Sequence, residues 1–193
     1  YLLPLSHDEV VHGKATILQK MHGDYNGKFP QARALYLYMM THPGKKLNFM
    51  GNELGHFREW DEKREQDWLL LDFPIHQAFF RYIKELNHLY LTRPALSRWD
   101  YQGEGFAWLG CQKPETGLFA YQRQCDGERL AVLLNLSDQA RSCQLPAPDS
   151  VELLLHTDWR RFGGSTPEGA VGKPLGGLLN VSLPPYSGQL FRM

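Results

Sequence analysis

A change of pattern near residues 94–98 constrains the fold more than any other feature of this chain. Before it, apolar residues recur at spacings of three and four from Ile75 to Tyr90, which predicts a helix with a wide apolar face that Pro94 ends. After it, short apolar runs separated by turn residues predict strands. We therefore expect an α/β part over residues 1–96 and an antiparallel β-sandwich over residues 97–193.

The first part alternates strand and helix signals. An apolar run over residues 1–5 predicts a buried strand, and a helix is expected over residues 31–41 with Pro30 in its first turn. A second short buried strand is expected over residues 47–50, followed by a polar loop to residue 72 and then the long helix. This order gives two strand–helix units.

The second part reads as six short strands. Val132-Leu133-Leu134 is apolar without alternation, so its strand should be covered on both faces, and Asp126-Gly127 is a hairpin turn signal. The strands are expected over residues 106–109, 118–121, 130–136, 151–155, 178–183 and 189–192.

Composition excludes several functional classes. The 21 basic and 21 acidic residues cancel and form no basic tract, so we expect no nucleic-acid partner. No uncharged apolar run approaches the roughly 18 residues that span a bilayer, and we expect no membrane association and no signal peptide. Cys111, Cys125 and Cys143 are read as free thiols of a cytoplasmic protein, although Cys111 and Cys125 could face one another across a hairpin.

Polar residues follow the first apolar run at once, as Ser6-His7-Asp8-Glu9. In eight-stranded α/β barrels the site is built at the carboxyl ends of the strands, so these side chains are candidates for chemistry. A zinc site is a poor interpretation, because His7 and His12 are five residues apart and do not share a helix face. We expect neither a metal nor a cofactor.

Residues 6–14, SHDEVVHGK, resemble the fourth conserved motif of the alpha-amylase superfamily in the form found in glycogen branching enzymes. The resemblance extends along the chain in the right order. It includes HPGKKLNFMGNELG at residues 42–55, FREW at 57–60, DW at 67–68, HTD at 156–158 and FGGS at 162–165.

This resemblance implies the last two strand–helix units of a (β/α)8 barrel followed by a C-terminal β-sandwich domain. It also implies a retaining reaction in which a 6-hydroxyl of a second glucan intercepts a covalent glucosyl intermediate. The nucleophilic Asp and the acid/base Glu of the family lie on barrel strands upstream of Tyr1, so we expect the chain alone to be inactive. His7 and Asp8 match the pair that binds sugar hydroxyls and stabilises the transition state.

Three further residues are weaker candidates for substrate binding: Glu9, Glu53 and Trp60. Glu53 could instead bind loop backbone N–H groups, and Trp60 could pack the loop onto the body of the protein. Arg58 is read as a solvated charge. The expected partner is an α-1,4-glucan such as glycogen, and the incomplete barrel should either self-associate or pack closely on the β-domain.

Two alternatives stay open at this point. One keeps the superfamily but changes the reaction, to an amylolytic hydrolase or a trehalose-forming relative. The other is a non-catalytic glucan-binding module that uses the β-domain alone, for which an exposed aromatic ridge on the sandwich would be the distinguishing feature.

Overall fold

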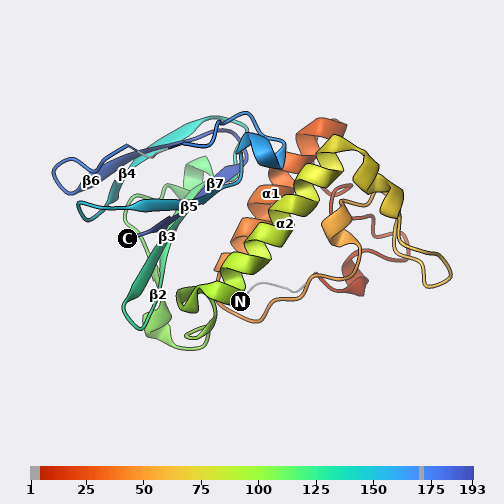
Figure 1. Cartoon of the computed structure of the whole chain (residues 1–193), viewed down its shortest axis with the longest axis horizontal. Coiled ribbons are helices and arrows are strands. Elements are labelled where there is room, and N and C mark those ends of the chain that lie inside the picture. Colours follow the sequence, from red (N-terminus) through yellow and green to blue (C-terminus); the bar gives the residue numbers. More distant parts are fainter. Residues whose placement is uncertain (1–4, 170–171) are drawn as a thin grey trace.

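The chain folds into three layers, seen in a computed structural model that describes residues 5–169 and 172–193 (Figure 1). Two long helices form one layer and pack on a five-stranded sheet, whose other face carries a two-stranded sheet. The helices are α1 (Tyr25–Thr41), α2 (Pro74–Thr92) and the single turn α3 (Pro94–Ser97). The strands are β1 (Phe106–Trp108), β2 (Leu118–Cys125), β3 (Glu128–Asn135), β4 (Arg141–Pro146), β5 (Glu152–His156), β6 (Leu178–Leu183) and β7 (Ser187–Arg192).

Helix α2 is the predicted long helix. Pro74 occupies its first turn, where a missing N–H costs nothing, and the buried residues follow the predicted spacing. These residues are His76, Phe79, Tyr82, Ile83, Leu86 and Leu89.

Helix α1 begins six residues earlier than predicted, at Tyr25 instead of residue 31. The carboxylate of Asp24 caps it by accepting from the Gly27 N–H at 2.8 Å. Pro30 therefore lies inside the helix, one turn beyond the position that the sequence predicted. The Gln31 side chain supplies a donor there, because its Nε2 lies 2.8 Å from the Gly27 carbonyl oxygen.

The buried strand predicted over residues 47–50 is wrong in its burial and its extent. Leu47 is 44% exposed and Met50 is 54% exposed. What forms is a short parallel bridge, in which the Leu5 N–H donates to Leu47 O at 3.0 Å and the Phe49 N–H donates to Leu5 O at 2.8 Å. Residues 1–4 of the first predicted strand lie outside the described residues.

The six predicted strands of the second half are confirmed, with ends that differ by a few residues. Sequence analysis missed β4, because Arg141-Ser142-Cys143-Gln144 offers few apolar residues and Pro146 reads as a turn. Nevertheless β4 pairs with β6 along its whole length. At the predicted hairpin, Asp126 (φ 49°) and Gly127 (φ 86°) both adopt left-handed backbone, which is typical of a type I′ turn.

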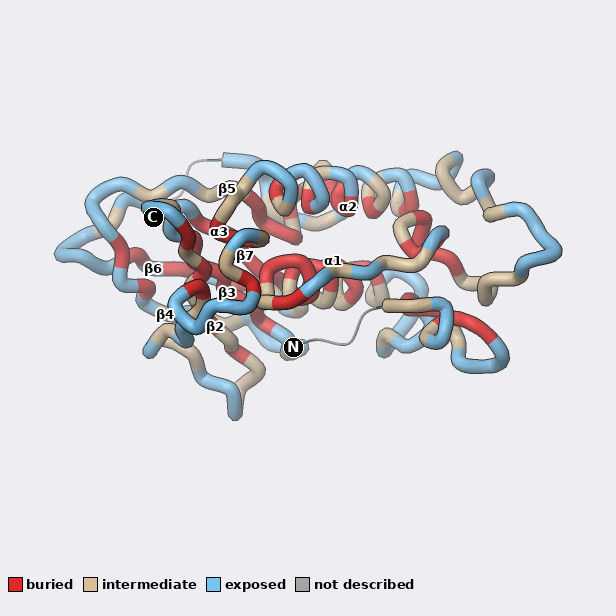
Figure 2. The backbone as a smooth tube through the Cα atoms, turned by 90° about the horizontal axis from the view of Figure 1, so that it is seen from below, coloured by how far each residue is buried: buried red, intermediate tan, exposed pale blue. Residues whose placement is uncertain are grey.

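The five-stranded sheet has the order β1-β2-β3-β7-β5, and its central strands β3 and β7 are buried on both faces (Figure 2). On β3, Leu130, Val132 and Leu134 pack against the helices. Ala131 and Leu133 point the other way and pack against β4 and β6. The prediction that this strand is covered on both faces is confirmed, and the β-sandwich is formed by the five-stranded and two-stranded sheets.

Buried polar groups join the helical layer to the sheet. Arg123 of β2 donates to the Thr41 carbonyl at the end of α1 at 2.7 Å and to a carboxylate oxygen of Asp100 at 2.7 Å. Arg33 of α1, which is 1% exposed, donates to the Phe162 carbonyl at 3.1 Å. The expected close packing of the first half on the β-domain is thus the arrangement seen, whereas self-association stays a prediction.

The cysteines do not pair as the sequence allowed. All three are free thiols, and Cys125 is buried at the end of β2. The neighbour of Cys111 is Cys143 of β4, so a contact between Cys111 and Cys125 across a hairpin is wrong. Among the helices of the described residues, none has the length and apolarity needed to cross a bilayer.

Candidate functional site

The residues His7–Glu9 form a single 3₁₀ turn that leaves the parallel bridge at Leu5. The Asp8 N–H donates to the Ser6 hydroxyl at 3.2 Å, which caps the turn. The side chains of His7 and Asp8 project outward, with 58% and 67% exposure, and His7 Nε2 lies 3.4 Å from Asp8 Oδ1. The turn therefore presents a ring nitrogen and a carboxylate side by side to solvent.

Aromatic rings support this turn from one side. The His7 ring lies 5.9 Å from the Phe49 ring, and Trp60 meets Phe49 edge to face at 5.2 Å. The Trp60 N–H also donates to the Val10 carbonyl at 3.1 Å. Trp60 is half-buried in these contacts, so it packs the loop onto the body, and Phe49 is the ring that Trp60 and His7 both contact.

The segment after the turn is clamped by Glu59, which sequence analysis did not single out. Its two carboxylate oxygens accept from the Gly13 N–H at 2.9 Å and the Ala15 N–H at 2.7 Å. These two hydrogen bonds lower the pKa of Glu59. They also hold a strained backbone, because His12 (φ 56°) and Ala15 (φ 67°) are left-handed without being glycine. No local pattern could have shown a contact between segments so distant in sequence.

Glu9 turns away from the His7–Asp8 pair. Its carboxylate lies 3.4 Å from the Lys20 ammonium, which also bonds to the Glu9 carbonyl. Both side chains are partly exposed, so the ion pair is weak in energy but orients Glu9 toward Lys20.

Glu53 lies in the 3₁₀ turn Asn52–Leu54, and its carboxylate accepts from the Gly51 N–H at 3.0 Å. Gly51 has φ 90°, and a Cβ there would collide with the side chains of Gln66 and His56, so only glycine fits. Glu53 also lines an open hollow of about 440 Å³ beside α2. Of the described residues, those that line this hollow do not include His7, Asp8 or Glu9. The structure thus places Glu53 in a loop-stabilising contact and does not bring it to His7.

Arg58 anchors the polar loop over residues 52–72. The prediction that Arg58 is a solvated charge is therefore wrong. The guanidinium binds the Asp67 carboxylate through Nε and one terminal nitrogen, at 2.8–3.2 Å. This hydrogen bonding lowers the pKa of Asp67. Beneath it, burial lowers the pKa values of His56 and His76, and His76 bonds to the Leu54 carbonyl at 2.7 Å. The loop that carries Trp60 is therefore fixed at several points.

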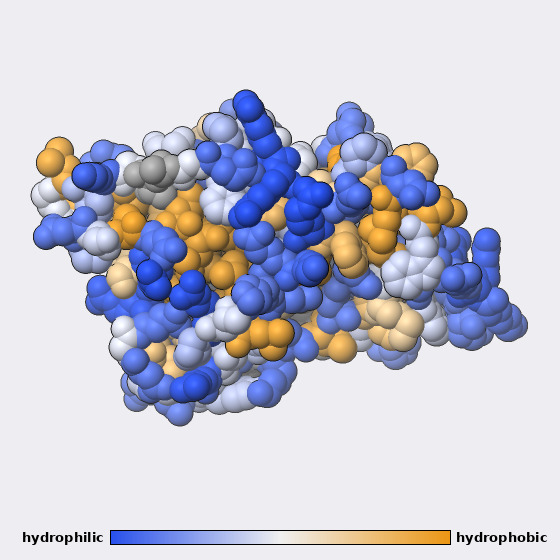
Figure 3. Space-filling model, in the orientation of Figure 1, coloured by the Kyte–Doolittle hydropathy of each residue, from blue (hydrophilic) through white to orange (hydrophobic). Residues whose placement is uncertain are grey.

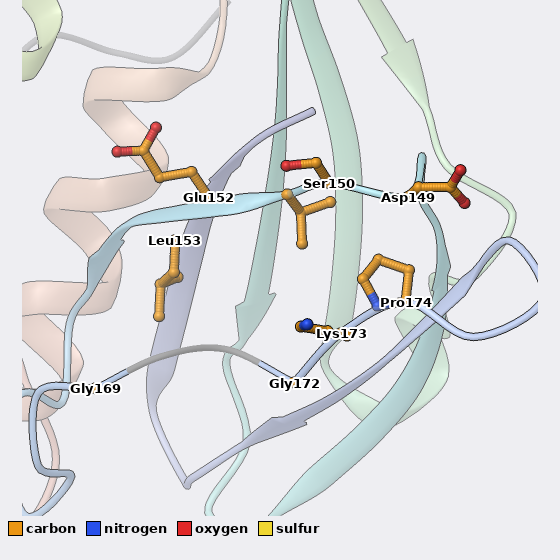
Figure 4. A pocket seen from close by; sticks show the side chains of 9 residues that line it. Asp149, Ser150, Glu152, Leu153, Gly169, Gly172, Lys173 and Pro174 are labelled. Carbon is orange, nitrogen blue, oxygen red and sulfur yellow. The ribbon is translucent and has the colours of Figure 1, made fainter.

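Among the described residues, the two best-formed hollows contain none of the His7–Glu9 side chains. A hollow of about 580 Å³ lies on the sandwich beside β5, and Figure 4 shows that Glu152, Leu153 and Lys173 are among its lining residues. The His7–Asp8 pair lies instead on an open surface. On the face shown in Figure 3, hydrophilic side chains break the apolar surface into separate areas. Among the described residues, no group of three or more His, Cys, Asp or Glu side chains is placed to hold a metal ion.

Comparison with known sequences gives a consistent result over the whole chain. The 1,4-alpha-glucan branching enzyme GlgB of Nitrosococcus oceani is 40% identical over all of this chain and 27% of its own length. The branching enzymes of Oceanobacillus iheyensis and Nitrosomonas europaea are 43% and 40% identical, over 86% and 100% of this chain. Only about a quarter of the length of these relatives, 27% and 28%, is spanned by the chain. Residues 113–190 also match a domain of unknown function, DUF3459.

Solved structures with a similar arrangement include a debranching enzyme and AmyP. The native debranching enzyme of Nostoc punctiforme superposes with a TM-score of 0.64 at 19% identity, over 95% of this chain and 34% of that one. AmyP in complex with maltose superposes with a TM-score of 0.62 at 15% identity, over 86% of this chain and 35% of that one. These likenesses show the fold. The sequence matches confirm the predicted relationship and place the chain with the bacterial 1,4-alpha-glucan branching enzymes, as their C-terminal part.

Proposed function

We propose that this chain is part of an enzyme that cleaves an α-1,4-glucan and transfers the released chain to a 6-hydroxyl, forming an α-1,6 branch. The observation that carries the proposal is the 40–43% identity to branching enzymes, over most or all of the chain. The exposed His7–Asp8 pair at the end of the bridged segment supports it, because such a pair suits hydrogen bonding to sugar hydroxyls.

The role we assign to His7 and Asp8 is stabilisation of the transition state. A carboxylate accepts from two hydroxyls of a sugar ring, and these bonds strengthen as the ring flattens toward an oxocarbenium ion. The imidazole adds a second polar contact on the same ring. We assign Glu9, Glu53 and Trp60 to binding of sugar units beyond the ring held by His7 and Asp8, with Trp60 offering an aromatic surface.

We assign the nucleophile and the acid/base to residues outside this chain. Three carboxylates around the candidate site are already engaged, and their partners support this assignment. Glu9 pairs with Lys20, Glu53 accepts from Gly51, and Glu59 accepts from two backbone N–H groups. A retaining reaction needs two carboxyl groups facing the scissile bond at about 5 Å from one another, and these three are held elsewhere.

We also infer that α1 and α2, with the segments that precede them, are the last two strand–helix units of a (β/α)8 barrel. The parallel bridge between Leu5 and Asn48 supports this, because it joins the two segments in the sense that barrel strands require. The alpha-amylase-type neighbours support it as well. In this arrangement the 1–96 part belongs to the catalytic domain and the 97–193 part is the C-terminal domain.

Assays of the isolated chain and of a longer polypeptide that includes the upstream barrel test the proposal. The chain alone should leave the iodine absorbance of amylose unchanged, whereas the longer protein should lower it and create α-1,6 linkages. Release of reducing ends without new branches would favour a hydrolase. Glucan binding by the chain with no activity in either protein would favour a non-catalytic module.

The Asp8→Asn variant of the longer protein tests the role of the pair. Loss of one contact that forms in the transition state costs on the order of 100- to 1000-fold in kcat, or about 3–4 kcal/mol. Asp138→Asn is the matched control, since Asp138 is an exposed aspartate of the β-domain. A lower melting temperature with normal kcat per folded molecule would move Asp8 to a structural role.

The proposed partner is an α-1,4-glucan or glycogen; AmyP, one of the structural neighbours, was crystallised with maltose. We place the protein in the cytoplasm, in keeping with its three free thiols. Self-association through exposed residues such as Leu47 and Met50 remains part of the proposal, and light scattering that shows a strict monomer would remove it.

A further inference from the structure

Two of the three cysteines lie together on the β-sandwich. Cys111 follows β1 at the edge of the five-stranded sheet, and Cys143 lies in β4 opposite Val181 of β6. Both are partly exposed, and they lie close enough for each thiol to alter the pKa of the other. They share an open hollow of about 570 Å³, which is also lined by Lys113, Ser142, Gln144, Asn180, Val181 and Ser182. A small thiol-reactive molecule therefore has access to both sulfur atoms.

We propose that Cys111 and Cys143 form a reversible redox pair, in which Cys111 reacts with a small disulfide of the glutathione class and Cys143 resolves the adduct. The Cys111 thiolate attacks one sulfur of the small disulfide, whose S–S bond breaks and releases one small thiolate. Cys143 then gives up its proton, which the small thiolate released in the first step takes up through solvent, and the Cys143 thiolate attacks Cys111 Sγ and expels the second small thiolate, which is protonated in turn. Two protein thiols are oxidised to one disulfide, and the small disulfide is reduced to two thiols.

The order of the two steps follows from the surroundings of each thiol. Contact with the Cys143 thiol lowers the pKa of Cys111 to about 7, so much of it is thiolate near neutral pH. The same contact and burial raise the pKa of Cys143. Among the described residues that line the hollow, Lys113 carries the positive charge that favours an incoming anionic disulfide. An accessible thiol of lowered pKa beside a resolving cysteine is the arrangement found in redox sensors.

The disulfide would join the two sheets of the sandwich, because Cys111 belongs to the edge of one sheet and Cys143 to the other. Cross-linking these segments closes a loop in the unfolded chain and should raise the melting temperature by about 5–15 °C. Cys125 is the internal control, since it is 1% exposed and burial raises its pKa.

The experiment treats the 193-residue chain with oxidised glutathione at pH 8, then alkylates it under denaturing conditions and maps the peptides by mass spectrometry. We expect an intramolecular Cys111–Cys143 disulfide, alkylated Cys125 and a raised melting temperature, all reversed by dithiothreitol. Cys143→Ser should trap glutathione on Cys111, and Cys111→Ser should lose most of the adduct. Cys125→Ser should behave as the parent chain.

Three outcomes would overturn the proposal. They are full alkylation of all three cysteines after oxidation, a disulfide that includes Cys125, and an adduct that forms as fast in Cys111→Ser as in Cys143→Ser. The variants place serine at partly exposed positions, so circular dichroism of each can show that it is folded before the thiols are scored.

Discussion

Removing the Asp100 carboxylate tests how much stability depends on a buried ion pair in the second half of the chain, whose arginine also binds the end of α1. Arg123 and Asp100 have side-chain exposures of 0% and 1%, and their atoms meet at 2.7 Å. The guanidinium also donates to the carbonyl oxygens of Thr41 at 2.7 Å and Gly105 at 3.2 Å. Asp100→Ala would leave a buried guanidinium with two neutral acceptors and no counter-charge.

Breaking a buried pair by removing one partner costs about 3–5 kcal/mol. The two carbonyl contacts remain in the variant, so we expect the lower end, about 3 kcal/mol. For a chain of this size each kcal/mol lowers the melting temperature by about 2–4 °C, which gives a decrease of about 6–12 °C. Scanning calorimetry and urea unfolding of the two proteins measure both quantities.

The matched control is Arg98→Gln, which breaks an exposed pair. Arg98 and Asp126 have side-chain exposures of 65% and 55% and lie 3.2 Å apart. An exposed pair contributes about 0–1 kcal/mol, so this variant should unfold within a few degrees of the parent chain. If Asp100→Ala is as stable as Arg98→Gln, the buried pair contributes no more to stability than an exposed one and the reasoning is refuted.

Three further predictions follow from the same structure. Burial lowers the pKa of His156 from 6.5 to about 4. Between these pH values His156 is therefore neutral in the folded protein and protonated in the unfolded chain. The contribution of neutral His156 to stability is complete above about pH 6.5 and falls as the pH drops toward about 4. In His156→Asn the melting temperature, measured by calorimetry, should depend less on pH between about 4 and 6.5. Glu59→Gln should speed hydrogen exchange at the Gly13 and Ala15 amides severalfold, and unchanged exchange would show that the clamp is dispensable. Residues 97–193 expressed alone should bind a hydrophobic dye and lack cooperative unfolding, and a sharp thermal transition would contradict this.

Much of the fold could be predicted because its elements carry strong local patterns. The apolar stripe of α2, the Asp126-Gly127 turn and the continuous apolar run of β3 each determine a structure through neighbours in sequence. The errors fall where local signals compete. The start of α1 was predicted from Pro30 alone, whereas Asp24 caps the helix further upstream. The sequence of β4 has no strong strand pattern, and it forms a strand because β6 supplies its partner.

The candidate site was predicted unevenly for a similar reason. His7 and Asp8 could be singled out because they interrupt an apolar run, and the structure places them side by side on an exposed turn. The contacts that position this turn join residues far apart in sequence, as in the bonds from Glu59 to Gly13 and Ala15. No spacing rule identifies such pairs. The sequence therefore predicts the polar side chains of the site better than the long-range contacts that hold those side chains in place.

The composition boundary near residues 94–98 is not a boundary of the hydrophobic core. Leu130, Val132 and Leu134 belong to a buried cluster that also contains residues of α1 and α2, in the part of the chain before that boundary. A β-domain that folded independently would carry polar residues on this face, because a strand with one solvated face alternates. The apolar face of β3 is therefore explained by the helices that cover it. This argues against the reading in which the sandwich works as a free-standing glucan-binding module, and it favours a domain whose core is completed by the part that carries His7 and Asp8.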